Sequence, residues 1–145
     1  MVLTALYYLE NLGWSVIPVG RNKKPITEWK FYQTNKPTRE QVIEWWTKYP
    51  DANVAIITGK VSNLIVVDID PRHGGSLDEF KQIIAPRVKT GGNGWHIYFQ
   101  YEDGFRNGAG VKQGIDIRAE GGYVIAPPSL HKSGNYYEWE VFPNE

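Results

Sequence analysis

The 145-residue chain contains no cysteine. Disulfide bonds and cysteine-ligated zinc sites are therefore excluded, and a cytoplasmic location is expected. The chain also lacks an apolar run near the length of about 20 residues that a membrane-spanning helix needs. The first residues include Glu10 and no basic segment, so we expect neither a signal peptide nor a membrane partner.

An excess of charge of either sign is missing too, because 16 basic residues balance 16 acidic ones. This balance disfavours a protein whose whole surface binds nucleic acid. A local basic groove beside an acidic site would give the same net charge of zero, so it stays possible. Hydrophobic residues make up 41% and charged residues 22% of the chain, which is the composition of a globular domain. The length predicts a single domain over residues 1–145.

Hydrophobic periodicity and turn residues predict helices early in the chain and strands late. Apolar residues at helical spacing predict a helix over residues 3–12, which Gly13 ends. Capping-box patterns at residues 38–41 and 76–79 predict a second helix ending near Pro50 and a third of about two turns ending by Pro86. The predicted strands cover residues 14–19, 53–58, 64–70, 87–90, 95–101, 114–118, 123–126 and 136–141. This order predicts an α+β fold rather than a doubly wound sheet.

Two aspartates, Asp68 and Asp70, end the apolar strand predicted over residues 64–70. Residues i and i+2 of a strand point to the same face, about 6.6 Å apart. Two carboxylates at that separation repel by about 2.5 kcal/mol at an effective dielectric constant of about 20. A divalent cation such as Mg²⁺ would offset the repulsion, because it binds carboxylate oxygens directly. The pattern also fits a strand that has emerged into solvent, or a carboxylate that caps the following turn.

A glycine-rich segment at residues 90–94 precedes the strand that carries His96. Glycine backbone can approach a ligand closely, and its exposed N–H groups can bind phosphate. Alternation along the strand places His96 and Tyr98 on one face and Ile97 and Phe99 on the other. The segment matches neither the Walker A nor the Rossmann pattern. A glycine hairpin followed by a buried histidine explains it equally well.

The segment GIDIR, residues 114–118, alternates polar and apolar residues, so Asp116 and Arg118 share one face. It supplies a third carboxylate and a cation for a triphosphate. The alternative is an exposed Asp–Arg pair that contributes little stability. Each of the three patterns is weak alone. Together they could place three carboxylates, a histidine and an arginine on one face of a sheet, which suits two metal ions and a nucleoside triphosphate.

In these motifs the sequence resembles the bifunctional DNA primase/polymerase N-terminal domain, the Prim-Pol branch of the archaeo-eukaryotic primase superfamily. VVDID is similar to the family's metal-binding D-x-D motif, and GGNGWHIYF to its second motif, built around a nucleotide-binding histidine. GIDIR followed by GGYVIAPPS is similar to the third motif. The opening segments GWSVIPV, KKP and NVAIITG are similar as well, so the resemblance covers nearly the whole chain. It implies an α+β fold with an RRM-like primase/polymerase catalytic sheet, flanking helices and an N-terminal αβ unit.

The resemblance also implies an activity and its catalytic residues. Asp68, Asp70 and Asp116 would bind Mg²⁺ or Mn²⁺, and His96 would contact the triphosphate. The implied reaction is template-directed nucleotidyl transfer by a DNA primase or DNA polymerase, in the replication of a plasmid, phage or mobile element. Its partners would be a single-stranded DNA template, a primer, and dNTP or NTP. A helicase module or an accessory helical domain often follows in this family.

A wider set of residues is expected to bind the nucleotide. Arg118 and Lys24 are expected phosphate partners, backbone N–H groups near Gly91 and Gly92 would hold phosphates, and the segment with Ser129 and His131 lies near the site in this family. The expected nucleotide-binding residues are His96, Arg118, Lys24, Gly91, Gly92, Ser129 and His131.

The sequence departs from the family pattern at Gly94, where a serine is common two residues before the motif histidine. Backbone N–H groups would have to replace that hydroxyl contact. Relatives usually continue beyond this length, so we expect an N-terminal fragment or an unusually short form of a larger replication protein. Two other functions stay open. The domain could bind nucleotide or single-stranded nucleic acid without catalysis, or it could be a metal-dependent nuclease, since carboxylate clusters also serve phosphodiester hydrolysis.

Overall fold

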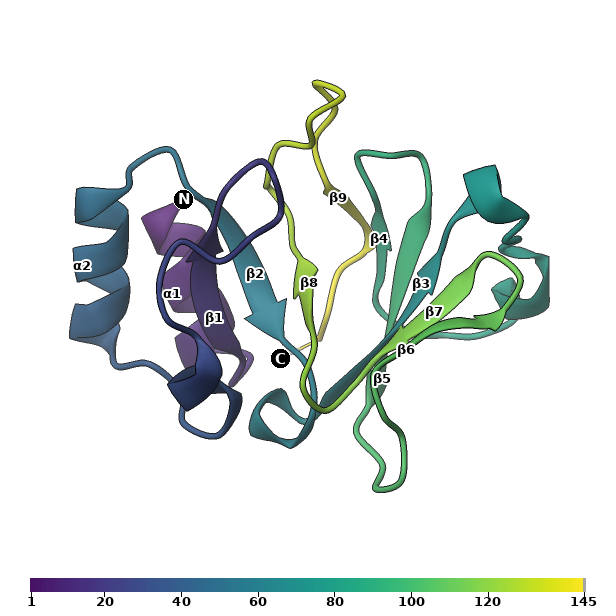
Figure 1. Cartoon of the computed structure of the whole chain (residues 1–145), viewed down its shortest axis with the longest axis horizontal. Helices are drawn as coiled ribbons and strands as arrows, with labels where there is room; N and C mark the ends of the chain where they lie inside the picture. Colours follow the sequence, from purple (N-terminus) through teal and green to yellow (C-terminus); the bar gives the residue numbers. More distant parts are fainter. Residues whose placement is uncertain (145) are drawn as a thin grey trace.

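The computed structural model describes residues 1–144, which form two α-helices, nine β-strands and four short 3-10 turns (Figure 1). The helices are α1 (Val2–Glu10) and α2 (Arg39–Lys48). The strands are β1 (Ser15–Val19), β2 (Asn53–Ile57), β3 (Leu64–Ile69), β4 (Arg87–Lys89), β5 (Trp95–Gln100), β6 (Gly108–Lys112), β7 (Ile115–Arg118), β8 (Tyr123–Ile125) and β9 (Glu138–Val141). The 3-10 turns are η1 (Lys30–Gln33), η2 (Lys60–Ser62), η3 (Pro71–His73) and η4 (Asp78–Phe80). The predicted α+β class is confirmed.

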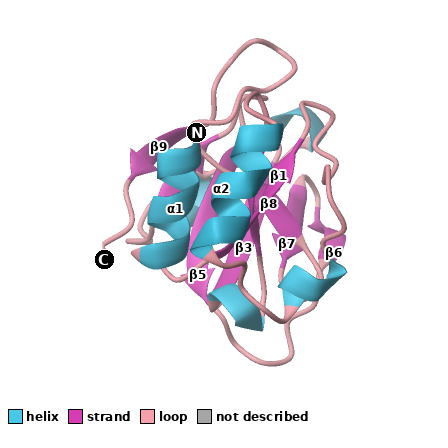
Figure 2. Cartoon of the chain, turned by 90° about the vertical axis from the view of Figure 1, so that its left-hand side faces the viewer, coloured by secondary structure: helices cyan, strands magenta, loops and turns pink. Residues whose placement is uncertain are grey.

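The strands form two antiparallel sheets that stand side by side in Figure 1. One has three strands in the order β1-β2-β8, and the other has six in the order β6-β7-β3-β5-β4-β9. Both helices lie against the three-stranded sheet, which they cover in Figure 2. The chain passes between the sheets three times, from β2 to β3, from β7 to β8 and from β8 to β9.

Helices α1 and α2 and strands β1 and β2 form the N-terminal αβ unit that the resemblance implies, and β8 joins their sheet from late in the chain. Every residue of β1 and β2 is buried, so both strands are apolar almost throughout. The predicted start of α2 is confirmed, because the Thr38 side chain accepts a hydrogen bond from the Gln41 N–H at 3.1 Å and so caps the helix. The buried side of α2 carries Val42, Trp45 and Trp46, the spacing of one helix face.

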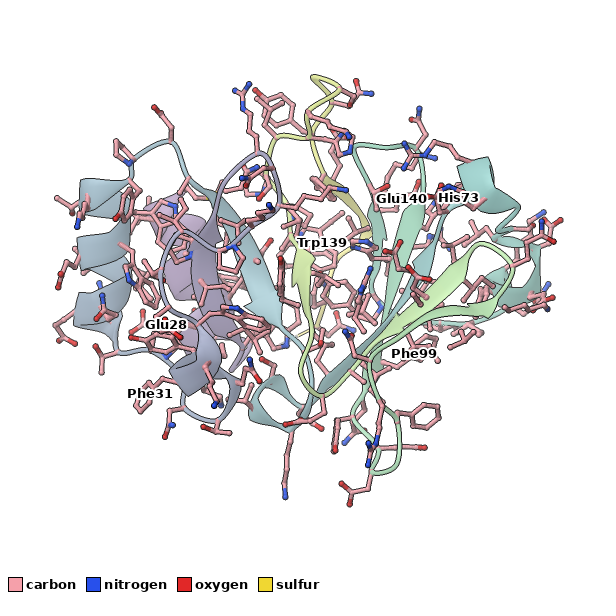
Figure 3. The ribbon with its side chains drawn as sticks, viewed as in Figure 1. Glu28, Phe31, His73, Phe99, Trp139 and Glu140 are labelled. Carbon is pink, nitrogen blue, oxygen red and sulfur yellow. The ribbon has the colours of Figure 1, made fainter. Side chains whose placement is uncertain are left out.

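Aromatic rings join the two sheets into one core. Trp14, next to β1, lies 5.4 Å from Tyr8 of α1 and 5.5 Å from Tyr98 of β5, measured between ring centroids. Trp139 of β9 lies 5.1 Å from Tyr98 and occupies the middle of the molecule in Figure 3. Its Nε1–H donates to the Tyr8 hydroxyl at 3.0 Å. We call Tyr8, Trp14, Tyr98 and Trp139 the aromatic block.

The six-stranded sheet has two unlike faces because its central strands alternate. Ile69, Ile97 and Ile115 pack together on the outer face, whereas Val66 and Tyr98 join the core shared with the three-stranded sheet. The predicted alternation of the strand around His96 is therefore confirmed. The inner face is the one that carries the polar side chains.

The structure corrects two elements of the sequence prediction. Residues 76–86 do not form a helix of two turns: Ser76 does accept from the Asp78 N–H at 3.1 Å, but only the three-residue turn η4 follows. Leu77 and Phe80 pack against the outer apolar cluster, but Ile84 is 99% exposed. A helix would place Ile84 on the same face as those two residues, so the apolar surface does not extend far enough to stabilise two turns. Strand β6 was not predicted, because its sequence GAGVK is rich in glycine, which strands disfavour.

Within residues 1–144, no helix has the length and apolar character needed to cross a membrane.

Candidate nucleotide and metal site

The three sequence motifs meet because β3 lies between β5 and β7. In the strand register Asp68 is directly opposite His96 on β5 and directly opposite Asp116 on β7. Directly opposed residues of antiparallel strands have Cβ atoms about 4.5–5.5 Å apart and point to the same face. The register thus places the three side chains in one row across the inner face of the six-stranded sheet.

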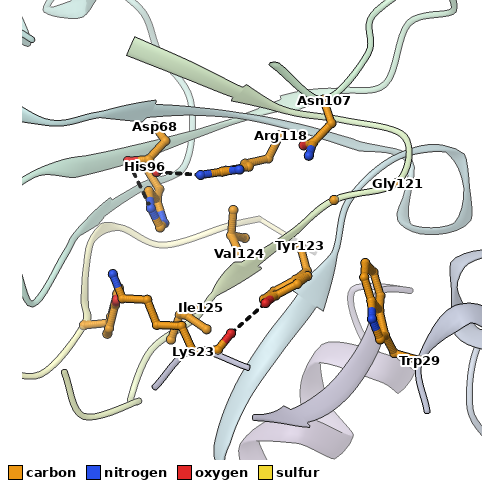
Figure 4. Close-up of a pocket in the computed structure, with 12 residues that line it drawn as sticks. Lys23, Trp29, Asp68, His96, Asn107, Arg118, Gly121, Tyr123, Val124 and Ile125 are labelled. Atoms are coloured by element: carbon orange, nitrogen blue, oxygen red, sulfur yellow. Dashed lines mark hydrogen bonds and ion pairs between the residues drawn. The ribbon is translucent and has the colours of Figure 1, made fainter. Parts of the chain in front are cut away.

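Arg118 and His96 hold the Asp68 carboxylate from two sides (Figure 4). Asp68 Oδ1 lies 3.4 Å from His96 Nε2, and Asp68 Oδ2 lies 3.9 Å from Arg118 Nη2. The same Nη2 lies 3.4 Å from Asp116 Oδ2, so Arg118 bridges the two carboxylates. Burial on its own would raise the pKa of Asp68, but the neighbouring His96 and Arg118 outweigh it and the pKa is lowered. Asp68 is therefore a carboxylate at neutral pH.

Asp116 is also held by the strand that the sequence did not predict. Its Oδ1 accepts a hydrogen bond from the Gly110 N–H of β6 at 2.6 Å. The alternative of a local Asp116–Arg118 pair is thus part of the observed arrangement. The pair is not isolated, however, because Arg118 reaches Asp68 as well.

Asp70 follows the end of β3 and turns toward the next loop. Its Oδ1 accepts from the Arg72 N–H at 3.0 Å, and its Oδ2 lies 2.8 Å from His73 Nδ1. The Arg72 guanidinium approaches both oxygens at 3.3 Å. Asp70 therefore caps η3, which was the alternative interpretation of the second aspartate.

Two cavities adjoin the row. The larger has a volume of about 260 Å³ and extends from Asp68, His96 and Arg118 to Trp29 and Tyr123, as Figure 4 shows. The smaller, of about 70 Å³, lies beside the glycine-rich segment and η3. Both cavities are lined by Lys23, Asp68, His96 and Tyr137. A carboxylate, a histidine and a lysine therefore stand where the two cavities meet.

A family model described as bifunctional DNA primase/polymerase, N-terminal, matches residues 5–145. The chain belongs to this Prim-Pol family. No curated protein matches the sequence. Membership implies an enzyme of the nucleotidyltransferase type that acts on nucleic acid and nucleotides, and enzymes of this family generally use divalent metal ions.

The Prim-Pol motif residues form a donor set that fits a divalent cation in part. Asp68 and Asp116 are directly opposed carboxylates, and Mg²⁺ is commonly held in proteins by one or two carboxylates. Asp70 does not join them, because Arg72 and His73 occupy its oxygens. Accordingly, no three acidic, histidine or cysteine side chains in residues 1–144 are grouped closely enough to hold a metal ion. A site with all three aspartates requires Asp70 to leave Arg72 and His73.

His96 is the most buried polar residue of the row, with a side chain 8% exposed. Its Nε2 faces Asp68, and its buried Nδ1 has no hydrogen-bond partner among the described residues. Buried polar atoms are rarely left without a partner. The contact of His96 with a ligand stays a prediction, and its place on the wall of both cavities supports it.

Lys23 reaches the site, whereas the sequence analysis named its neighbour Lys24 as a phosphate partner. Lys23 lines both cavities, whereas Lys24 lines neither. Lys23 has a φ of 67°, and its carbonyl accepts from the Tyr123 hydroxyl at 2.6 Å, which fixes the turn. Two adjacent lysines give no sequence signal for which one points inward. Only the turn geometry decides between them.

The glycines of the second motif have different tasks. A Cβ at Gly91 would overlap the Cβ of His131, and a Cβ at Gly94 would overlap the Ile69 carbonyl. These two glycines allow close packing of neighbouring segments. Gly92 and Gly94 both line the smaller cavity, and Gly91 does not.

Of the two residues after β8 that the sequence analysis names, one lines a cavity and one belongs to the scaffold. His131 lines the smaller cavity. Ser129 is fully buried and lines neither cavity; its Oγ accepts from the Val54 N–H at 3.0 Å. The sequence analysis did not single out Tyr137, whose ring lies 6.2 Å from His96 and 6.0 Å from His131. Burial and the charge of Asp68 raise the pKa of Tyr137 to about 12, so it keeps its proton.

Proposed function

We propose that this Prim-Pol domain catalyses template-directed nucleotidyl transfer, as a DNA primase or DNA polymerase in the replication of a plasmid, phage or mobile element. The observation that carries the proposal is the row of Asp68, His96 and Asp116, of which Asp68 and His96 line both cavities. The family match supports the same chemistry. The substrates would be a single-stranded DNA template, a primer and dNTP or NTP.

The reaction joins two negatively charged reactants. A bond forms between the 3′-oxygen of the primer and the α-phosphorus of the nucleotide, and the bond from that phosphorus to the β-phosphate breaks. The 3′-hydroxyl proton passes to solvent, and the electron pair of the broken bond leaves with pyrophosphate. Mg²⁺ or Mn²⁺ held by Asp68, Asp70 and Asp116 would supply the two-metal chemistry of this step, activating the 3′-hydroxyl and neutralising the leaving group.

The protein's own side chains would orient the nucleotide. Arg118 offers a guanidinium on the wall of the larger cavity, where bidentate contact with a phosphate is favourable. His96 would contact the triphosphate from its place on the wall of both cavities. Trp29 and Tyr123, at the far end of the larger cavity, would border the nucleoside.

The deciding experiment is extension of a labelled primer on a single-stranded DNA template with Mn²⁺ and dNTPs. We expect product ladders from the wild type, and loss of synthesis by a factor on the order of 10³ from Asp68→Asn and Asp70→Asn, as for removal of groups that stabilise transition-state charge. Asp51→Asn is the matched control, because Asp51 is exposed and lines neither cavity. Full synthesis by Asp70→Asn would contradict the assignment of Asp70 as a metal ligand.

The same assay separates the two other functions. Incorporation of nucleotides in the order that the template dictates, with release of pyrophosphate, supports a polymerase. Cleavage of the labelled strand without nucleotide incorporation would indicate a nuclease. Nucleotide binding without either product would indicate a binding module, and the proposal would then be wrong.

A further inference from the structure

Three nitrogen-bearing side chains from three separate loops reach the smaller cavity. Lys23 comes from the loop after β1, Arg72 from η3 and His131 from the loop between β8 and β9. None of the three lies on the catalytic strands. Their convergence beside Asp68 and His96 is therefore a product of the tertiary fold rather than of the three sequence motifs.

The position of the proton on His131 follows from its hydrogen bonds. The backbone N–H of Ser133 donates to Nδ1 of His131 at 3.0 Å, so Nδ1 carries a lone pair. The proton of the neutral ring is therefore on Nε2. Burial and the nearby cations Lys23, Lys132 and Arg72 lower the pKa of His131, which keeps the ring neutral. His131 is thus a fixed N–H donor.

That donor and the Arg72 guanidinium flank the same point. A Cβ placed on Gly92 would lie 3.5 Å from His131 Nε2 and 3.9 Å from Arg72 Nη2. The Gly92 N–H itself has no acceptor among the described residues. The imidazole N–H and the guanidinium therefore approach the same side of Gly92, which lines the smaller cavity, and two such donors suit an anion.

Lys23 adds a charge without a close acidic partner. No carboxylate of the described residues lies within 4.0 Å of its ammonium. Burial, the main cause, and the cations Lys132 and Arg72 lower the pKa of Lys23, while Asp68 opposes them. Cations gathered in this way repel each other, and an anion between them would relieve the repulsion.

The charges that line the smaller cavity balance, since Lys23 and Arg72 face Asp68 and Asp70. A divalent cation on the aspartates would leave the cavity with a positive charge of two. The cavity would then match the β- and γ-phosphates that are linked to the reacting phosphorus. The carboxylates form the metal side of the cavity and the three nitrogen-bearing side chains its phosphate side.

We propose that Lys23, Arg72 and the Nε2–H of His131 bind the β- and γ-phosphates of the incoming nucleotide and the pyrophosphate that is released. The inference rests on the proposed nucleotidyl transfer and assigns its leaving-group site. The nucleoside then passes beside Asp68 and His96 and lies in the larger cavity, toward Trp29. Lys24, predicted from the sequence as a phosphate partner, has no place in this site.

The test is the binding of inorganic pyrophosphate in the presence of Mg²⁺, measured by calorimetry. We expect Lys23→Gln to weaken binding at least about tenfold, because it removes one charge-assisted contact. The matched control is Lys132→Gln, which removes the same charge from an exposed neighbour that lines neither cavity. We expect its effect to be less than about twofold, as for a screened surface charge. Equal effects of the two substitutions would overturn the proposal.

A second measurement needs no substitution. The Nε2-bound proton of His131 should be visible by ¹H–¹⁵N NMR in the wild type, and it should shift when Mg²⁺ and pyrophosphate are added. Mg²⁺ alone should leave it unchanged. Binding of pyrophosphate without a shift at His131 would show that the anion lies elsewhere.

Kinetics then separate this inference from the proposed function. Lys23→Gln should raise the KM for dNTP and the inhibition constant of pyrophosphate by the same factor, since both ligands use the same phosphate contacts. Primer extension with an unchanged KM would retain the proposed function and overturn the leaving-group site. Pyrophosphate binding at His131 and Lys23 without any primer extension would retain the site and overturn the proposed function.

Discussion

The two sheets of this protein bury their strands in different ways. In the three-stranded sheet both β1 and β2 are buried along their whole length, and the core there is apolar. In the six-stranded sheet the inner face begins apolar at Val66 and continues into Asp68, opposite His96 and Asp116. The three-stranded sheet therefore contributes mainly to stability, and the six-stranded sheet carries the candidate catalytic residues. Substitutions in the two sheets should therefore affect different measurements.

Among four substitutions that compare the two sheets, the largest effect is expected from Asp116→Asn in the six-stranded sheet. Nucleotidyl transfer should fall by a factor on the order of 10² to 10³, because a charge that serves the metal and the transition state is lost. The melting temperature should change little, since the Asp116 side chain is only partly buried, at 31% exposure. Primer extension and thermal unfolding of the same sample measure the two quantities. A large loss of stability would contradict the view that the six-stranded sheet serves catalysis and not stability.

The next effect is expected from Ile56→Ala in the three-stranded sheet. Ile56 is fully buried between Val16 and Val124, so its truncation should lower the free energy of unfolding by about 2–5 kcal/mol. The turnover number of the folded fraction should stay at the wild-type value. Urea unfolding and kinetics at low temperature test the two parts separately.

Ser129→Ala tests whether a residue that the resemblance assigns to the nucleotide instead stabilises the fold. The Ser129 hydroxyl accepts from the Val54 N–H and lies 3.2 Å from the Val54 carbonyl, inside the scaffold. Its removal should destabilise the fold by about 1–3 kcal/mol, because a buried donor and acceptor lose their partner. The KM for dNTP should not change. A raised KM with unchanged stability would restore Ser129 to the nucleotide site.

The smallest effect at neutral pH is expected from Tyr8→Phe, at about 1 kcal/mol of stability. Tyr8 donates to the Pro127 carbonyl at 2.5 Å, and burial raises its pKa to about 12 despite the hydrogen bond from Trp139. A pKa above the unfolded value of about 10 stabilises the fold fully below pH 10. This stability is lost as pH rises toward 12. Alkaline unfolding curves should therefore be shallower for Tyr8→Phe than for the wild type.

The sequence predicted those parts of the fold that depend on local pattern. The strand over residues 64–70 was correct to within one residue, because four consecutive apolar residues between polar ones specify a buried strand. The helix over residues 76–86 was wrong, because its capping turn is local but its stability needed a tertiary surface that is missing at Ile84. Strand β6 could not be predicted, since its pairing with β7 overrides the poor strand propensity of glycine.

The candidate site divides in the same way. The motifs with Asp68, His96 and Asp116 are visible in the sequence, and strand register alone brings them together. Lys23 and Tyr137 could not be found, because their approach depends on a loop turn and on the path after β8. The orientation of Asp70 was also out of reach, since it depends on contacts with Arg72 and His73.

The three passages of the chain between the sheets have a consequence for cooperativity. Strand β8 completes the sheet that β1 and β2 begin, although β3 to β7 intervene in the sequence. Neither sheet is a continuous segment, and both depend on the aromatic block, in which Trp14 and Trp139 come from opposite ends of the chain. We therefore expect the two sheets to unfold together in a single transition. No single cut in the chain separates one complete sheet from the other.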